Sequence, residues 1–127
     1  MLPLTFITCG VIINLWRIEY YKEPSGRQPV PEWLDSLDKK TREYLRDKVV
    51  RLQHHGLILL DTNMMRPIKG YCGDFYEIKF NKYRITLYHQ TSSNTFILLH
   101  GFKKERMRET HEIEKAYSRL RDYKSRG

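Results

Sequence analysis

Cysteine is scarce in this 127-residue sequence, and long apolar segments are missing. The two cysteines, Cys9 and Cys72, form no CxxC pair, which disfavours a disulfide framework, a zinc site and a thiol redox motif. The longest uncharged run, residues 1–16, is shorter than a bilayer span and lacks the basic start of a signal peptide. We therefore expect a cytoplasmic protein that does not enter a membrane.

Sequence motifs for cofactors and metals are missing as well. None of the seven glycines belongs to a Walker loop or a dinucleotide-binding loop. The histidines His54, His55 and His111 lack the spacing of metal ligands, and no cluster of carboxylates is suited to Mg²⁺. We expect a protein that uses no cofactor and acts without a metal ion.

Positive charge is what the chain has in excess. It carries 23 Lys and Arg residues against 15 Asp and Glu residues, a formal net charge of +8. Residues 1–63 hold 9 basic and 8 acidic side chains, whereas residues 64–127 hold 14 basic and 7 acidic ones. A basic second half predicts a polyanionic partner, such as nucleic acid or an acidic protein, and a merely solvated basic surface is the alternative.

The order of expected helices and strands indicates the fold class. The chain has no internal repeat or long linker, and its length fits one domain. Alternating apolar residues predict strands, while helical periodicity, a capping Asp38 and a terminating Gly56 predict helices. The expected elements are a strand at 15–21, helices at 31–37 and 38–56, strands at 75–80, 83–89 and 95–102, and a helix capped by Thr110. This β-α-α-β-β-β-α order favours an α+β domain with a small, largely antiparallel sheet packed by helices.

The two-residue loop Asn81-Lys82 predicts a hairpin and its register. The register pairs Phe80 with Tyr83, Lys79 with Arg84, Ile78 with Ile85, Glu77 with Thr86 and Tyr76 with Leu87. Alternation places the apolar members on a face that helices can bury, and it places Lys79, Arg84, Glu77, Thr86 and Tyr88 on the other face. Lys79 opposite Arg84 is a like-charge pair that Glu77 would partly offset and a bound phosphate would stabilise. We expect Arg84 at the surface of this charged face.

Two lysines directly after the last strand extend this charged region. In an antiparallel sheet the end of that strand lies beside the start of the Tyr83 strand, so Lys103 and Lys104 are expected near Arg84. Separate segments thus converge on one basic site. A solvated strand face balanced by Glu77 is the alternative, and for Arg106 and Arg108 a solvated role is the more common one.

Four segments in this order resemble a known family. They are Val30-Pro31-Glu32-Trp33-Leu34, then Tyr76-Glu77-Ile78-Lys79 with Tyr83-Arg84-Ile85, then Leu98-Leu99-His100-Gly101-Phe102-Lys103-Lys104, and finally Thr110 opening a helix that contains Ala116. Together they resemble the phage-derived HigB branch of the RelE/ParE toxin superfamily. The resemblance covers about Leu15 to Tyr123, which implies a toxin domain at 15–127 and makes residues 1–14 an N-terminal extension outside it.

The resemblance implies the toxin of a bacterial type II toxin–antitoxin module that cuts messenger RNA on the ribosome and is neutralised by an antitoxin, often a helix-turn-helix protein. In such chemistry the RNA 2′-hydroxyl attacks the adjacent phosphate in line. By position Arg84 would stabilise the transition state, and Lys79 and Lys103 or Lys104 would hold phosphate, one of them serving as general base. Lys79 stands where many relatives carry arginine. Further RNA contacts are expected from Arg66, Lys69, Lys82, Arg106 and Arg108.

The remaining roles have two interpretations each. Glu77 would orient Arg84 or act as a base, and His100 would be the general acid or a packed histidine of the sheet. Tyr88 and His89 are weaker candidates for proton transfer. The competing functions are a ParE-like inhibitor of DNA gyrase and a non-catalytic module that binds RNA or the antitoxin. The convergence of Arg84 with the lysines favours the endoribonuclease.

Overall fold

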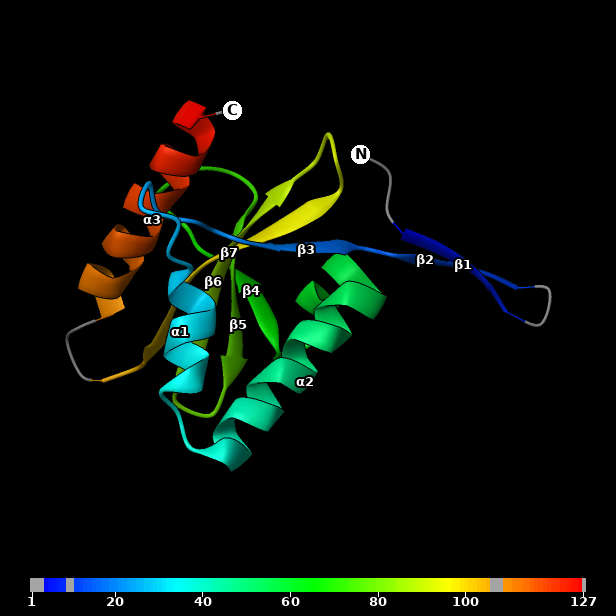
Figure 1. The fold of residues 1–127 in the computed structure, drawn as a ribbon, viewed down its shortest axis with the longest axis horizontal. Helices are drawn as coiled ribbons and strands as arrows, with labels where there is room; N and C mark the ends of the chain where they lie inside the picture. Colours follow the sequence, from blue (N-terminus) through cyan, green and yellow to red (C-terminus); the bar gives the residue numbers. More distant parts are fainter. Residues whose placement is uncertain (1–3, 9–10, 106–108, 127) are drawn as a thin grey trace.

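A five-stranded sheet forms the centre of the protein. The structure, a computed structural model, describes residues 4–8, 11–105 and 109–126. The sheet has the order β3-β7-β6-β5-β4 (Figure 1), and its strands are β3 (Arg17–Tyr20), β4 (Met65–Pro67), β5 (Phe75–Phe80), β6 (Tyr83–Gln90) and β7 (Thr95–Lys103). Strand β3 runs parallel to β7, and every other pair in this sheet is antiparallel. The predicted α+β class with a largely antiparallel sheet is confirmed.

The hairpin of β5 and β6 has the predicted register. All five expected pairs are present, including Lys79 opposite Arg84 and Glu77 opposite Thr86. Asn81 in the connecting turn has a φ of 53°, the left-handed conformation that asparagine tolerates. The sheet contains one strand that the sequence did not predict: β4 is three residues long and pairs at the edge with β5. Such a short segment, with Pro67 at its end, shows no alternation.

Among the described residues, three α-helices and one 3₁₀ helix pack around the sheet. They are α1 (Pro29–Asp35), α2 (Lys39–His55), η1 (Gly56–Asp61) and α3 (Glu109–Arg126). Asp38 caps α2 by accepting a hydrogen bond from the Thr41 amide at 3.1 Å, and Gly56 ends that helix with a φ of 60°, as predicted. Helix α3 already includes Glu109, so Thr110 lies in its first turn. The prediction that Thr110 caps this helix is wrong.

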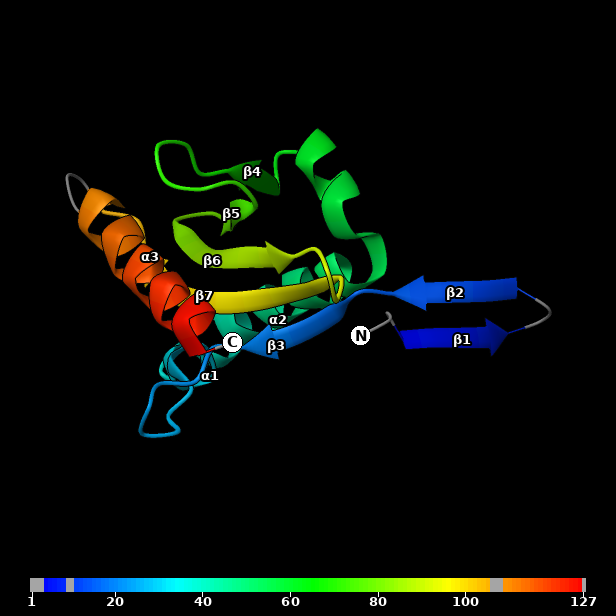
Figure 2. The same ribbon diagram turned by 90° about the horizontal axis from the view of Figure 1, so that it is seen from above.

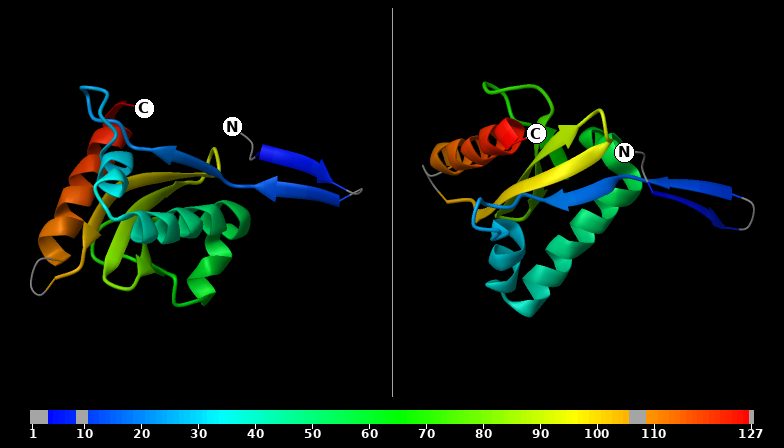
Figure 3. Two further views of the ribbon diagram at one scale, coloured as in Figure 1. Left: turned by 60° about the horizontal axis from the view of Figure 1, so that its bottom comes forward. Right: turned by 45° about the horizontal axis from the view of Figure 1, so that its top comes forward.

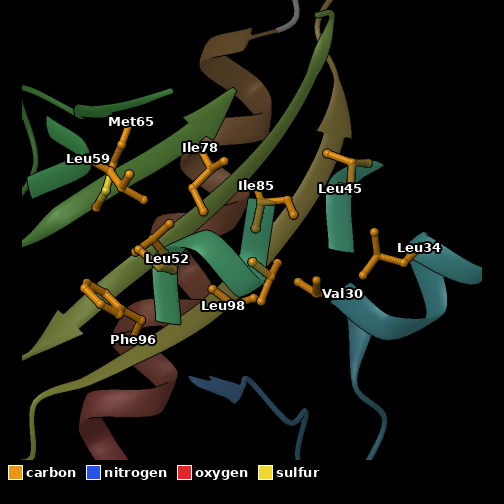
Figure 4. Packing of buried hydrophobic residues seen from close by; sticks show 12 residues of the cluster. Val30, Leu34, Leu45, Leu52, Leu59, Met65, Ile78, Ile85, Phe96 and Leu98 are labelled. Carbon is orange, nitrogen blue, oxygen red and sulfur yellow. The ribbon is translucent and has the colours of Figure 1, made fainter. Parts of the chain in front are cut away.

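The helices cover the two faces of the sheet in separate layers. Helices α1 and α2 lie on one face and α3 lies on the other (Figures 2 and 3). Figure 4 shows the larger core, where side chains of α1 and α2 meet those of the strands: Val30, Leu34, Leu45, Leu52, Ile78, Ile85, Phe96 and Leu98. The smaller core packs Ile113, Ala116 and Leu120 of α3 against the opposite face of β7. Strand β7 is therefore buried on both faces from Thr95 to Phe102, as its continuous apolar run predicts.

A β-bulge in β7 changes which residues face α3. His100 pairs with Thr86 and Leu98 pairs with Leu87, so Leu99 is an extra residue without a partner in β6. Leu99 packs against α3, and the next residue, His100, also points toward that helix. Gly101 consequently faces α1, where the ring of Trp33 lies.

Residues near the amino terminus form a separate hairpin. Strands β1 (Leu4–Thr8) and β2 (Val11–Leu15) pair with each other and lie outside the five-stranded sheet. In every view this hairpin extends away from the rest of the domain (Figures 1 and 3). This strand pair was not predicted from the sequence. Among the helices of the described residues, none is long and apolar enough to cross a membrane.

Candidate functional site

The main candidate site is a cleft where the β5–β6 turn, the end of β7 and the start of α3 meet. Its volume is about 870 Å³, and its lining consists of Asn81, Lys82, Arg84, Lys103, Lys104, Glu105, Glu109 and Thr110. The strand register explains the convergence, because Tyr83 pairs with Lys103 and Arg84 with Phe102. The amide of Lys104 also donates a hydrogen bond to the carbonyl oxygen of Lys82. The structure thus brings Arg84, Lys103 and Lys104 together as predicted, and Lys82 joins them.

Arg84 is buried, which corrects the expectation that it stands at the surface. Only 8% of the residue is exposed. One terminal nitrogen donates hydrogen bonds to the carbonyl oxygens of Asn81 at 2.6 Å and Tyr83 at 2.9 Å, so the side chain folds back onto its own turn. Its Nε atom is buried without a hydrogen-bond partner among the described residues and lies 3.8 Å from Oε1 of Glu77. These contacts fix the guanidinium at the inner wall of the cleft.

Glu77 links Arg84 to a second arginine. Its side chain is 1% exposed, and it accepts a short hydrogen bond from Nε of Arg66 on β4. A carboxylate removed from water in this way needs ionic partners, and the two arginines supply them. Glu77 therefore lies where it can orient Arg84, one of its two predicted roles. Because it is buried and engaged by Arg66, it has no access to a substrate in the cleft.

Glu109 continues this ion-pair network around the cleft. Its Oε1 atom lies 3.1 Å from a terminal nitrogen of Arg66, and its Oε2 atom lies 3.4 Å from Nζ of Lys104. The network therefore runs from Arg84 through Glu77, Arg66 and Glu109 to Lys104, alternating in charge. Glu109 is not among the residues predicted from the sequence. The one signal in the sequence that could have indicated it is an acidic residue directly after the basic run 103–108, at the start of a helix.

A second cleft lies on the other side of Glu109. Its volume is about 630 Å³, and its lining consists of Arg66, Pro67, Ile68, Lys69, Tyr71, Glu77, Glu109, Thr110 and Ile113. Two predicted RNA contacts, Arg66 and Lys69, lie here. Because Glu109 and Thr110 line both clefts, the two hollows are neighbours separated by the first turn of α3.

Two predicted site residues lie outside both clefts. Lys79 pairs with Arg84 in the strand register, yet within the described part of the chain it lines neither cleft. His100 lies between β7 and α3, where Nε2 is 3.0 Å from Oε2 of Glu112 and Nδ1 is 2.8 Å from a terminal nitrogen of Arg119. A guanidinium only donates, so Nδ1 accepts from Arg119 and the hydrogen on Nε2 is donated to Glu112.

Burial lowers the pKa of His100 below its ordinary value of 6.5. The positive charges of Arg119 and Lys115 act in the same direction, whereas the Glu112 carboxylate opposes them. The structure therefore holds a neutral imidazole at the interface of β7 and α3, stacked on the Phe102 ring at 5.7 Å. This environment suits a histidine packed within the sheet, the second interpretation of His100, rather than a general acid.

Tyr88 and His89, the weaker candidates for proton transfer, also lie in packed surroundings. Tyr88 is half-buried and packs against the core beneath α3, with the Lys124 ammonium 4.7 Å from its ring centre. His89 is buried, and its Nε2 atom is 3.0 Å from Oδ1 of Asn94. Arg106 and Arg108 lie outside the described residues. Across residues 4–8, 11–105 and 109–126, no three His, Cys, Asp or Glu side chains are grouped as metal ligands.

Comparison with known proteins gives the family. Residues 32–121 match the family described as "Phage derived protein Gp49-like (DUF891)". The isolated E. coli RelE toxin is similar in structure, with a TM-score of 0.54 and 20% identity over 83% of this chain and 98% of that one. A free E. coli RelE in which two arginines are replaced by alanine gives a TM-score of 0.58 and 18% identity over 84% and 98% of the two chains. A search of curated proteins by sequence finds no match. The chain therefore belongs to the phage-derived Gp49-like family, and its fold is similar to that of the RelE toxins.

Proposed function

We propose that this protein is the toxin of a type II toxin–antitoxin module and cleaves messenger RNA on the ribosome without a metal ion. The observation that carries the proposal is the cleft in which Arg84, Lys82, Lys103 and Lys104 converge from a turn and two strands. A row of cations at the wall of an open cleft suits a phosphodiester backbone. Membership of the Gp49-like family and the RelE fold support the same class of function.

The chemistry requires a group that stabilises charge on phosphorus. The 2′-oxygen attacks the neighbouring phosphate, its proton goes to a base, and the 5′-oxygen leaves and takes up a proton, so that a 2′,3′-cyclic phosphate remains. Two negative charges develop on the phosphoryl oxygens in the transition state. Arg84 is fixed before substrate arrives by its bonds to Asn81 and Tyr83, and a preorganised cation of this kind stabilises developing charge most effectively.

The other residues of the cleft bind and exchange protons in this proposal. Lys103 and Lys104 are exposed at the rim, where they would hold the flanking phosphates and serve as the proton-transfer groups. Glu77 orients Arg84 and Arg66 from beneath the cleft. We assign no proton transfer to His100, because both of its ring nitrogens are engaged by α3. Lys79 is a positioning residue at most.

Mapping of RNA 5′ ends after brief expression in bacteria tests this function. Cuts within translated regions that follow the codon phase are the expected result, and the Arg84→Lys variant should produce far fewer of them. A DNA-damage response with intact transcripts would instead identify a gyrase inhibitor. Growth inhibition without RNA cleavage or DNA damage would identify a non-catalytic binding module. An antitoxin encoded beside the toxin, often a helix-turn-helix protein, is the expected partner, and the cytoplasm is the expected compartment.

A further inference from the structure

The two carboxylates of the ion-pair network differ in how easily they can be replaced. The Glu77 side chain on β5 is 1% exposed, whereas the Glu109 side chain is 31% exposed and lies at the rim of both clefts. Removing a buried carboxylate leaves its cationic partners unpaired and lowers stability strongly, whereas an exposed ion pair contributes little to stability. Glu77 is therefore a fixed part of the site, and Glu109 is free to exchange its partners for another anion.

The position of Glu109 is one that a substrate phosphate would occupy. Its two oxygens contact two different cations, Arg66 at 3.1 Å and Lys104 at 3.4 Å. The two free oxygens of a phosphodiester can bridge a pair of cations in the same way. Arg66 would remain anchored by Glu77 after such an exchange, so its guanidinium would be held ready for the incoming phosphate.

We propose that Glu109 is an intramolecular competitor of the RNA backbone, which occupies a phosphate subsite between Arg66 and Lys104 until substrate displaces it. The inference rests on the proposed function and deepens it. The phosphate next to the one at Arg84 replaces the carboxylate, and the RNA strand then runs from the first cleft past Thr110 into the second. There, Lys69 and the apolar wall of Ile68 and Tyr71 are suited to a following nucleotide.

The test is the Glu109→Gln variant, which removes the charge and keeps the size of the side chain. The probe is a single-stranded RNA oligonucleotide with 2′-O-methyl groups, which binds but cannot be cleaved because its 2′-hydroxyls are blocked. Fluorescence anisotropy gives its Kd over a range of salt concentrations. We expect E109Q to bind about threefold to tenfold more tightly than the wild-type protein. The slope of log K against log salt should be steeper by about 0.7, because one more phosphate is neutralised in full.

Two further variants separate a competitor from a change in overall charge. Glu114→Gln removes the same charge from an exposed residue of α3 that lines neither cleft, so its affinity should change less than about twofold. In a Lys104→Met background the gain from E109Q should shrink, because one of the two cations it uncovers is absent. Equal gains from E109Q and E114Q would overturn the inference.

The outcomes for the inference and for the function are distinct. If the wild-type protein binds the oligonucleotide and E109Q binds it equally well, the competitor role is wrong and the RNA site stands. If neither protein binds at any salt concentration, the cleft does not bind RNA outside the ribosome and the competitor role is wrong, while the mapping of RNA 5′ ends decides the proposed function separately. Tighter binding by E109Q together with an unchanged E114Q supports the competitor role.

Discussion

Trp33 of α1 occupies the space that a side chain at Gly101 of β7 would need. A Cβ atom placed on Gly101 would lie 2.1 Å from Cε3 of the Trp33 ring. These residues belong to two of the four segments on which the family resemblance rests, and the fold shows why the segments occur together. The indole packs directly on the β7 backbone, two residues before Lys103. Packing of α1 therefore positions the strand end that carries the lysines of the cleft.

Replacement of Gly101 by alanine is expected to destabilise the protein. Neither the indole nor the strand backbone can move by the required distance without disturbing the core, and such overpacking costs about 1–3 kcal/mol. Urea unfolding measures the loss. Gly73→Ala is the matched control, because a Cβ atom at Gly73 meets no atom within 4 Å. Equal stability of the two variants would show that α1 does not pack on β7 in this way.

Arg84→Lys is expected to reduce RNA cleavage more than tenfold while the protein stays folded. Lysine keeps the charge but loses the planar fork, which binds two backbone carbonyls and, in the proposed function, would bind a phosphate as well. Arg84→Ala should in addition lower the free energy of unfolding by about 1–3 kcal/mol, because it leaves buried polar groups unpaired. Cleavage assays combined with thermal unfolding separate the two effects. Wild-type cleavage by R84K would remove Arg84 from the catalytic site.

Lys103→Ala is expected to weaken RNA binding without affecting stability. The side chain is exposed, so the free energy of unfolding should change by less than about 0.5 kcal/mol. Binding of a 2′-O-methyl oligonucleotide should lose about 0.7 from its salt slope, the contribution of one phosphate contact on a single strand. Lys40→Ala, an exposed change in the first turn of α2, serves as control. An identical salt slope for K103A and K40A would contradict the placement of phosphate in the cleft.

The stability of the protein is expected to fall as the pH drops below about 6.5, because of His100. Its pKa is lowered in the folded state, so the unfolded chain takes up a proton first and is favoured over that range. The slope cannot exceed about 1.4 kcal/mol per pH unit for one group. Urea unfolding between pH 7.5 and 5 measures it, and His100→Gln should flatten the curve. His111→Gln, an exposed change in the first turn of α3, should leave the curve as it is.

Local patterns predicted those parts of the fold in which sequence spacing fixes geometry. The register of β5 and β6 follows from a two-residue turn and strict alternation. Asp38 begins α2 through its capping side chain, and Gly56 ends it through its left-handed backbone. The convergence of Arg84 with Lys103 also follows, because it depends only on antiparallel pairing. Each of these predictions rests on interactions between residues that are close in sequence or directly paired.

The parts that the sequence did not predict depend on contacts between distant elements. A continuous apolar run from Phe96 to Leu99 contains no alternation that could reveal the bulge, and the bulge turns His100 toward α3. The burial of Arg84 depends on a guanidinium that folds back onto its own turn. The role of Glu109 appears only when α3 is placed beside β4, because its partner Arg66 lies far away in the sequence.

The parallel pairing of β3 with β7 has a consequence for synthesis of the chain. Arg17 pairs with Thr95 and Tyr20 with Leu98, so β3 is synthesised long before β7, the strand with which it pairs. A nascent chain cannot finish its central layer until that distant segment has left the exit tunnel. Glu109 and Thr110, which also line the cleft, are translated later still. A nascent chain therefore lacks the complete lining of the cleft until translation has passed these residues.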